Sequence, residues 1–146
     1  MKSRHARLAD RQAGGAAGLV LDAGALQALE VHPIRLLADL QRAHDLGLPI
    51  WIPAGSLAQT WRGGPRSALL ARLLKQPCCT VVEVDQRSAR EIGEFIASIR
   101  LPAHVKPDIA DAHVALTTRT TRSLVWTSDP KDIAAYQVDT DFIRRI

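Results

Sequence analysis

Residues 123–133 read SLVWTSDPKDI, a short apolar run that ends abruptly at three polar residues. The run Leu124–Trp126 consists of residues that favour strands, and it predicts a buried β-strand. Asp129 followed by Pro130 predicts the start of a helix, because an Asp N-cap accepts hydrogen bonds from the first helical turn and proline is tolerated there. This stretch therefore reads as strand, acidic turn and helix.

The same order of strand, acid and helix occurs in GLVLDAGAL near the beginning of the chain. Apolar runs of this kind predict strands over residues 19–21, 49–52, 80–84 and 124–126. Helical periodicity predicts helices over residues 23–30, about 33–46, 55–62, 66–75, 86–100, 108–120 and 131–136. Strands that alternate with helices of this length predict an α/β fold, with a mainly parallel central sheet flanked by helices.

Length and composition indicate one globular domain. The chain has 146 residues, of which 47% are hydrophobic and 23% are charged, a balance that excludes an intrinsically disordered protein. The formal net charge is +4, and most of it comes from residues 1–17, which hold four basic residues and one acidic residue. We therefore expect a flexible basic arm over 1–17 and the folded domain over 18–146, and the basic balance alone is weak evidence for a nucleic-acid surface.

Cysteine usage and hydropathy indicate the compartment. The two cysteines, Cys78 and Cys79, are adjacent, so they are not expected to link distant parts of the chain, which suits a reduced intracellular environment. No apolar run approaches the roughly 20 residues that a membrane helix needs. We therefore expect a cytoplasmic protein that has no membrane partner.

Acidic residues come shortly after two of the predicted strands. Asp22 comes after the first strand and Asp129 after the fourth, and ligands of open parallel sheets bind beyond the carboxyl ends of the strands. Asp108 and Asp111 are three residues apart, which places both on one face at the start of a predicted helix. We expect these three segments to bring their carboxylates into one crevice.

Clustered carboxylates raise one another's pKa unless a cation neutralises them. Oxygen ligands suit Mg²⁺ or Mn²⁺, and such ions assist phosphodiester hydrolysis by stabilising phosphate charge and activating water. Each acid also has a structural interpretation, because Asp22, Asp108 and Asp129 all precede helices and an N-cap contributes about 1 kcal/mol. The joint pattern, rather than any single acid, favours a metal site.

Taken together, these motifs resemble the PIN-domain family, in particular the VapC-like ribonuclease toxins, over about residues 18–137. LVLDAGAL is similar to the family's first strand with its first metal-binding acid, which corresponds to Asp22. DAHVAL resembles the third acidic position, at Asp111, and VWTSDPKDI resembles the last acidic turn, with Ser128 and Asp129. The resemblance implies a PIN-like three-layer sandwich.

One position departs from the family pattern. The stretch IPAGSLAQTWRGG resembles the family's second strand and the helix after it, on which a Glu usually supplies the second acid. Gln59 stands there instead, and its amide oxygen can accept hydrogen bonds but carries no charge. Asp108 and Glu30 are the candidate substitutes. Asp108 is preferred, because Glu30 lies eight residues, about 12 Å along a helix, from Asp22.

The resemblance implies a Mg²⁺- or Mn²⁺-dependent endoribonuclease that is the toxin of a type II toxin–antitoxin pair, with an antitoxin partner and a homodimeric state. Asp22, Asp111 and Asp129 would be catalytic and metal-binding, with Asp108 as a further metal ligand. Ser128 would position Asp129 or a metal-bound water. Arg62 would bind substrate phosphate through its planar fork, or compensate the end of its helix.

Two other classes of function stay open at this point. Gln59 is compatible with a catalytically weak scaffold that binds RNA or a protein partner. A phosphotransfer or receiver-type α/β domain could use Asp22 as a nucleophile. Such folds usually have a second acid close to the first, which DAGAL lacks, and a Lys late in the sheet, whereas Lys131 falls at a helix start.

Overall fold

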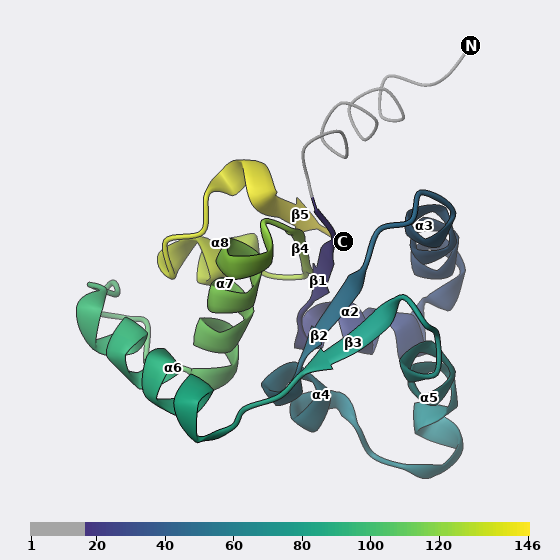
Figure 1. Cartoon of the computed structure of the whole chain (residues 1–146), viewed down its shortest axis with the longest axis horizontal. Helices are drawn as coiled ribbons and strands as arrows, with labels where there is room; N and C mark the ends of the chain where they lie inside the picture. Colours follow the sequence, from purple (N-terminus) through teal and green to yellow (C-terminus); the bar gives the residue numbers. More distant parts are fainter. Residues whose placement is uncertain (1–16) are drawn as a thin grey trace.

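A five-stranded sheet forms the centre of the protein in a computed structural model, which describes residues 17–146 (Figure 1). Its strands are β1 (Leu19–Leu21), β2 (Ile50–Pro53), β3 (Cys79–Val82), β4 (Leu124–Thr127) and β5 (Ile143–Arg145). The strand order is β3-β2-β1-β4-β5, and every neighbouring pair is parallel. The basic arm expected over 1–17 lies, apart from Ala17, outside the described residues.

Helices cover both faces of this sheet (Figure 1). The α-helices in the described part of the chain are α2 (Ala23–Val31), α3 (Pro33–Asp45), α4 (Ala54–Thr60), α5 (Ala68–Leu74), α6 (Gln86–Ser98), α7 (Ile109–Thr121) and α8 (Pro130–Ala135). Helices α2, α3 and α5 lie on one side, and α6, α7 and α8 lie on the other. Within residues 17–146, every helix is too short or too polar to cross a membrane.

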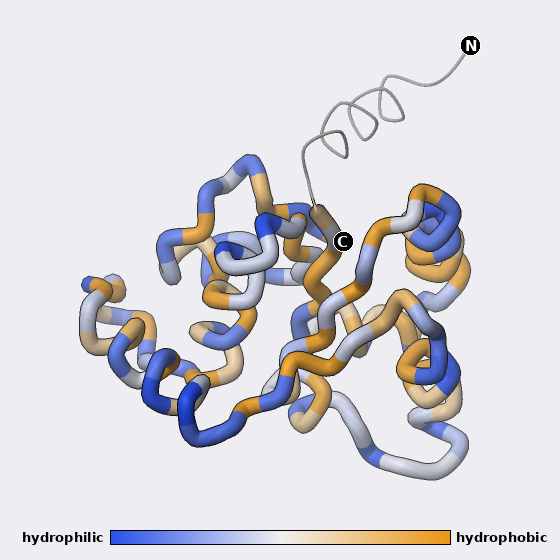
Figure 2. The backbone as a smooth tube through the Cα atoms, viewed as in Figure 1, coloured by the Kyte–Doolittle hydropathy of each residue, from blue (hydrophilic) through white to orange (hydrophobic). Residues whose placement is uncertain are grey.

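The core has two halves because successive residues of a strand point to opposite faces of the sheet. Val20 packs with residues of α6, α7 and α8, whereas Leu21 packs with residues of α2, α3 and α5. Both side chains are fully buried. The β1 segment is hydrophobic along its length, whereas α6 is largely hydrophilic on its outer side (Figure 2). This is the three-layer burial expected of a parallel sheet.

The structure confirms the predicted fold class, an α/β three-layer sandwich that is consistent with a PIN-like arrangement. Two local expectations need correction. The sheet has a fifth strand, β5, that the sequence did not indicate because two of its three residues are arginines. The helix expected over 66–75 begins instead as a 3-10 turn, η1 (Gly64–Ser67), with Pro65 in its first turn, and continues as α5.

The strand order places a switch point between β1 and β4. From β1 the chain winds outward through β2 to β3, then crosses to β4 on the other side of β1 and ends at β5. The carboxyl ends of β1 and β4 therefore lead into connections that run to opposite sides of the sheet, and in open α/β sheets such a switch point is where a ligand-binding crevice forms. Asp22 follows β1 at this crevice, and Asp129 lies two residues beyond the end of β4.

Candidate functional site

Asp22 is the most enclosed carboxylate at the switch point. It ends β1 and caps α2, where its Oδ1 accepts a hydrogen bond of 2.8 Å from the backbone N–H of Ala25. The residue is only 8% exposed. Burial raises the pKa of its carboxyl, and the charge of Asp129 adds to this, while hydrogen bonds to the charged form oppose it. Capping and a functional role are compatible here, because a carboxylate has a second oxygen.

Thr127 connects the two strand ends. It is the last residue of β4 and is fully buried. Its hydroxyl donates a hydrogen bond to the carboxylate of Asp22 and accepts one of 3.0 Å from the backbone N–H of Asp129. One side chain thus fixes the orientation of the first acid and the backbone position of the last.

The start of α7 contributes two further acids. Asp108 caps the helix, accepting a hydrogen bond of 2.9 Å from the backbone N–H of Asp111 in the first turn. The backbone N–H of Asp108 itself donates a 2.8 Å hydrogen bond to the hydroxyl oxygen of Tyr136, which is fully buried beyond the end of α8. This hydrogen bond therefore joins the acidic start of α7 to the residue that follows α8.

The start of α8 repeats this arrangement. Asp129 caps the helix, and its carboxylate accepts a long hydrogen bond of 3.4 Å from the backbone N–H of Asp132. Both residues are exposed. The spacing of Asp129 and Asp132 is the same as that of Asp108 and Asp111, so each helix presents one capping acid and one acid in its first turn.

The electrostatics of Asp111 show that these acids converge. Burial raises the pKa of Asp111 to about 6, and the further causes are the negative charges of four other aspartates, namely Asp108, Asp132, Asp22 and Asp129. These four come from the ends of β1 and β4 and from the starts of α7 and α8. The structure thus brings Asp22, Asp108, Asp111 and Asp129 close enough for their charges to act on one another, and it adds Asp132.

The donor set fits a hard divalent cation that keeps part of its water shell. All the converging groups are carboxylates, and Mg²⁺ prefers oxygen ligands. Within residues 17–146, no three Asp, Glu, His or Cys side chains already stand in an arrangement that holds a metal ion. Mg²⁺ is usually bound through only one or two carboxylates, with waters and substrate oxygens completing its coordination. The residues present therefore fit such an ion.

Ser128 lies against the first turn of α2. A Cβ atom built at Gly24 would collide with the Oγ and Cβ of Ser128, so the absence of a side chain at position 24 is what lets the turn after β4 approach Asp22. Ser128 is exposed, and its hydroxyl lies at the same switch point as Asp22 and Asp129.

Gln59 and Arg62 lie at the end of α4, which contacts both α2 and α7. Both residues are exposed. The Arg62 guanidinium donates hydrogen bonds of 2.8 Å to the backbone carbonyls of Gln59 and Trp61, so it satisfies carbonyls at the end of this helix. Arg62 would have to release these carbonyls before it could bind a phosphate with the same N–H groups.

Glu30 lies at the opposite end of α2 from Asp22. Its side chain is 9% exposed, and its Oε2 lies 3.7 Å from the Nε of Arg66. Its Oε1 is buried without a hydrogen-bond partner in the described part of the chain. Since α2 is continuous from Ala23 to Val31, Glu30 is about 12 Å along the helix from Asp22. Asp108 and Asp132 are therefore better placed than Glu30 to compensate for Gln59.

Sequence reasoning missed three residues that shape the site: Thr127, Asp132 and Tyr136. A signal for Asp132 was present, because the chain contains two acid pairs with the same spacing, DIAD at 108–111 and DPKD at 129–132. Thr127 could have been noted as the polar end of a buried strand. Tyr136 carried no local signal, since its contact with Asp108 spans 28 residues.

Comparisons with known proteins add little to this geometry. No protein-family model matches the sequence, and no curated protein matches it significantly. Among solved structures, the chain is similar to the crystal structure of FitAcB from Neisseria gonorrhoeae, at 17% identity, 82% coverage of this chain, 94% coverage of that chain and a TM-score of 0.47. A likeness this distant carries no functional argument, so any proposal rests on this chain's own residues.

The raised pKa of Asp111 predicts a pH-dependent stability. Because the folded protein holds this proton up to about pH 6 while an unfolded Asp releases it near pH 4, the ionised carboxyl costs stability above pH 6 and the cost disappears as the pH falls towards 4. In EDTA, Asp111→Asn should therefore raise the free energy of unfolding at neutral pH by about 1–2 kcal/mol, after allowance for its partial exposure. Urea denaturation at several pH values measures this.

Glu94→Gln is the matched control, because Glu94 is an exposed acid on α6, away from the crevice. Its effect should be small and independent of pH. If Asp111→Asn destabilised the metal-free protein at neutral pH, burial and the neighbouring charges would not disfavour the ionised Asp111 carboxyl.

Proposed function

We propose that the protein is a metal-dependent endoribonuclease that hydrolyses RNA phosphodiester bonds, using Mg²⁺ or Mn²⁺. The observation that carries this proposal is the convergence of five aspartates on the switch point, where burial and then the charges of the other four raise the pKa of Asp111 to about 6. Helix capping accounts for Asp22, Asp108 and Asp129 singly, but the mutual repulsion of the cluster opposes folding, and a divalent cation would neutralise it. The cation in turn would attract a phosphate.

The proposed role of each residue follows from its position in the site. Asp22, Asp111 and Asp129 would hold or orient the metal, supported by Asp108 and by the exposed Asp132. Thr127 would keep the Asp22 carboxylate aimed into the crevice through its hydrogen bond, and Ser128 would position Asp129 or a bound water. When present, the ion would stabilise phosphate charge and lower the pKa of an attacking water.

Arg62 supplies the remaining candidate contact with substrate. It is exposed at the end of α4, and its planar guanidinium matches a phosphate. In the structure its N–H groups bond to backbone carbonyls, so we propose that it contacts RNA through a rearranged side chain. The absence of a charge on Gln59 would lower the affinity for metal rather than alter the fold.

The sheet order argues against a receiver-type domain. Flavodoxin-like receiver folds have the strand order 2-1-3-4-5, whereas the order here is β3-β2-β1-β4-β5. The acid whose charge raises the pKa of Asp22, Asp129, comes from the turn after β4 and not from the first strand's own loop. A phosphotransfer role for Asp22 therefore has no support from this topology.

Cleavage of a mixed pool of structured and single-stranded RNA in EDTA, Mg²⁺ or Mn²⁺ tests the proposal. The wild type should cleave only with metal, and Asp22→Asn should remove the activity because the most enclosed carboxylate is lost. Thr127→Val should slow cleavage roughly 10- to 100-fold, as removal of a group that orients a ligand does, while Thr127→Ser retains the hydroxyl.

Glu94→Gln should cleave like the wild type. Equal activity in the wild type and Asp22→Asn would mean that the site is misassigned or that another nuclease is present. If a folded wild type bound RNA without cleaving it, and Asp22→Asn left that affinity unchanged, the protein would be a catalytically weak RNA-binding scaffold.

We also propose that the protein is the toxin of a toxin–antitoxin pair. Support comes from an exposed apolar surface where α2 meets α3, formed by Val31, Ile34 and Leu37, which are 65%, 87% and 42% exposed. Contiguous apolar side chains of this kind mark protein interfaces. An antitoxin with an apolar segment could cover this surface. The homodimer that the family resemblance implies remains a prediction.

A candidate antitoxin is the partner to test. Purified with this chain, it should bind the wild type, and Ile34→Asp should weaken binding roughly tenfold or more because a carboxylate would be buried against apolar groups. Asp39→Asn, on the exposed side of α3, is the control. Equal binding by Ile34→Asp would rule out this surface.

A further inference from the structure

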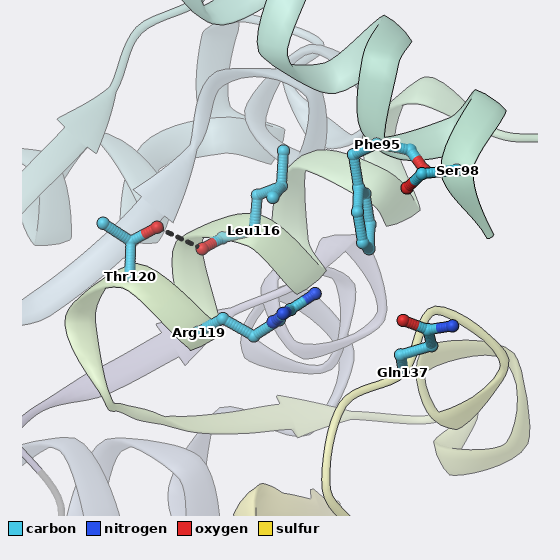
Figure 3. A pocket seen from close by; sticks show the side chains of 6 residues that line it. All are labelled: Phe95, Ser98, Leu116, Arg119, Thr120 and Gln137. Carbon is cyan, nitrogen blue, oxygen red and sulfur yellow. Dashed lines mark hydrogen bonds between the residues drawn. The ribbon is translucent and has the colours of Figure 1, made fainter.

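A second hollow lies away from the acids, between the ends of α6, α7 and α8. It is an open groove of about 550 Å³, within the range of ligand sites. Its lining comprises Phe95, Ser98, Leu116, Arg119, Thr120 and Gln137 (Figure 3). The converging aspartates line no part of it, so it is separate from the metal site proposed above.

Arg119 is the charged group of this groove, and it is held in place. Its guanidinium carbon lies 5.6 Å from the centre of the Phe95 ring, and Phe95 is only 8% exposed. Figure 3 shows the Arg119 side chain extending towards Phe95 and Gln137. No acceptor within residues 17–146 takes a hydrogen bond from this guanidinium, so a cation–π contact orients the group while its N–H donors stay free.

The polar side chains around Arg119 can accept hydrogen bonds from a ligand, whereas Arg119 can donate them. Ser98 and Thr120 donate their hydroxyl hydrogens, over 2.8 Å each, to the carbonyls of Phe95 and Leu116. Their oxygens can then only accept hydrogen bonds from a ligand. Arg119 can only donate. The groove therefore suits a ligand that combines an anionic acceptor with hydroxyl donors, as a ribose phosphate does.

Gln137 adds a strained residue to the rim. Its φ is +60°, a left-handed conformation that residues other than glycine adopt at an energetic cost. This backbone turn directly follows α8 and directs the chain to η2 (Thr140–Phe142) and β5. The Gln137 amide makes no side-chain hydrogen bond to another residue in the described range, so it can donate to a phosphate beside Arg119.

The groove and the acids lie at opposite ends of the same two helices. Helix α7 begins beside Asp108 and Asp111 and carries Arg119 in its last turn, while α8 begins at Asp129 and is followed by Gln137. Asp111 and Arg119 are eight residues apart, about 12 Å along the helix. An RNA strand with one phosphate at the acids would need only a short further length to reach Arg119.

We propose that this groove binds a backbone phosphate of the RNA substrate, through Arg119 oriented by Phe95, and that it does so without a metal ion. The inference rests on the proposed ribonuclease function for its choice of RNA. It assigns the groove a role in substrate affinity and in positioning the strand, not in the chemical step.

The test measures binding of a short fluorescein-labelled single-stranded RNA by anisotropy, in EDTA so that the RNA stays intact, from low to moderate salt. Arg119→Gln should weaken binding roughly tenfold, as loss of a charge-assisted hydrogen bond does. It should also reduce the slope of log K against log salt by about 0.7, the value for one contact to a single strand. Arg119→Lys keeps the charge but loses the planar fork, so its RNA affinity should lie between those of the wild type and Arg119→Gln.

Arg122→Gln is the matched control, because Arg122 is an exposed arginine at the end of the same helix that does not line the groove. Its effect should be clearly smaller than that of Arg119→Gln. If Arg119→Gln and Arg122→Gln lost the same RNA affinity, the effect would come from net charge and not from the groove, and the proposed site would be wrong. A wild type that bound no RNA in EDTA would also overturn it. Displacement of the RNA by inorganic phosphate at matched concentration would make free phosphate the ligand and overturn the assignment to RNA.

Cleavage assays in Mg²⁺ or Mn²⁺ separate this inference from the proposed function. Arg119→Gln should raise KM and leave kcat unchanged, which a general loss of structure would not do. If no condition gave cleavage while Arg119-dependent binding persisted, the nuclease proposal would fail and the phosphate site would stand. If the wild type and Arg119→Gln cleaved RNA with the same KM, the nuclease proposal would stand and the phosphate site would fail.

Discussion

The parallel pairing of β1 with β4 is the constraint on which the site depends. It sets Leu21 opposite Trp126, and the backbone N–H of Asp22 donates a 3.3 Å hydrogen bond to the carbonyl of Trp126. The two strands therefore end side by side, and the acids that follow them are forced together. Thr127 completes this junction by bonding to Asp22 and to the backbone of Asp129. This enforced proximity of carboxylates is the geometry on which the proposed cation site rests.

Much of this arrangement could be predicted from sequence. Apolar runs of three to five residues marked β1, β2, β3 and β4, and helical periodicity marked the helices between them, because burial on both faces leaves a clear pattern. Acids placed directly after strands could be assigned to one edge of the sheet, since parallel strands share their carboxyl ends. That rule placed Asp22 and Asp129 together, whereas Asp111 was added because it lies with Asp108 at the start of a predicted helix.

What could not be predicted depends on contacts between distant segments. The groove around Arg119 needs α6, α7 and the turn after α8 to meet, and no local pattern encodes that meeting. The same holds for Tyr136, which reaches Asp108 from another helix. Strand β5 was missed because it carries two arginines at the edge of the sheet, where one side lacks a neighbour and burial is weaker. Gln59 was identified, but its exposed position required the structure.

The most direct test of the central claim is a crystal structure of the protein grown with Mn²⁺, with anomalous difference density used to locate the ion. The account predicts a peak in the crevice between β1 and β4, within ligand distance of Asp22, Asp111 or Asp129, and loss of that peak in Asp22→Asn. A well-ordered crevice without a peak at saturating Mn²⁺, or a peak bound elsewhere on the chain, would contradict it.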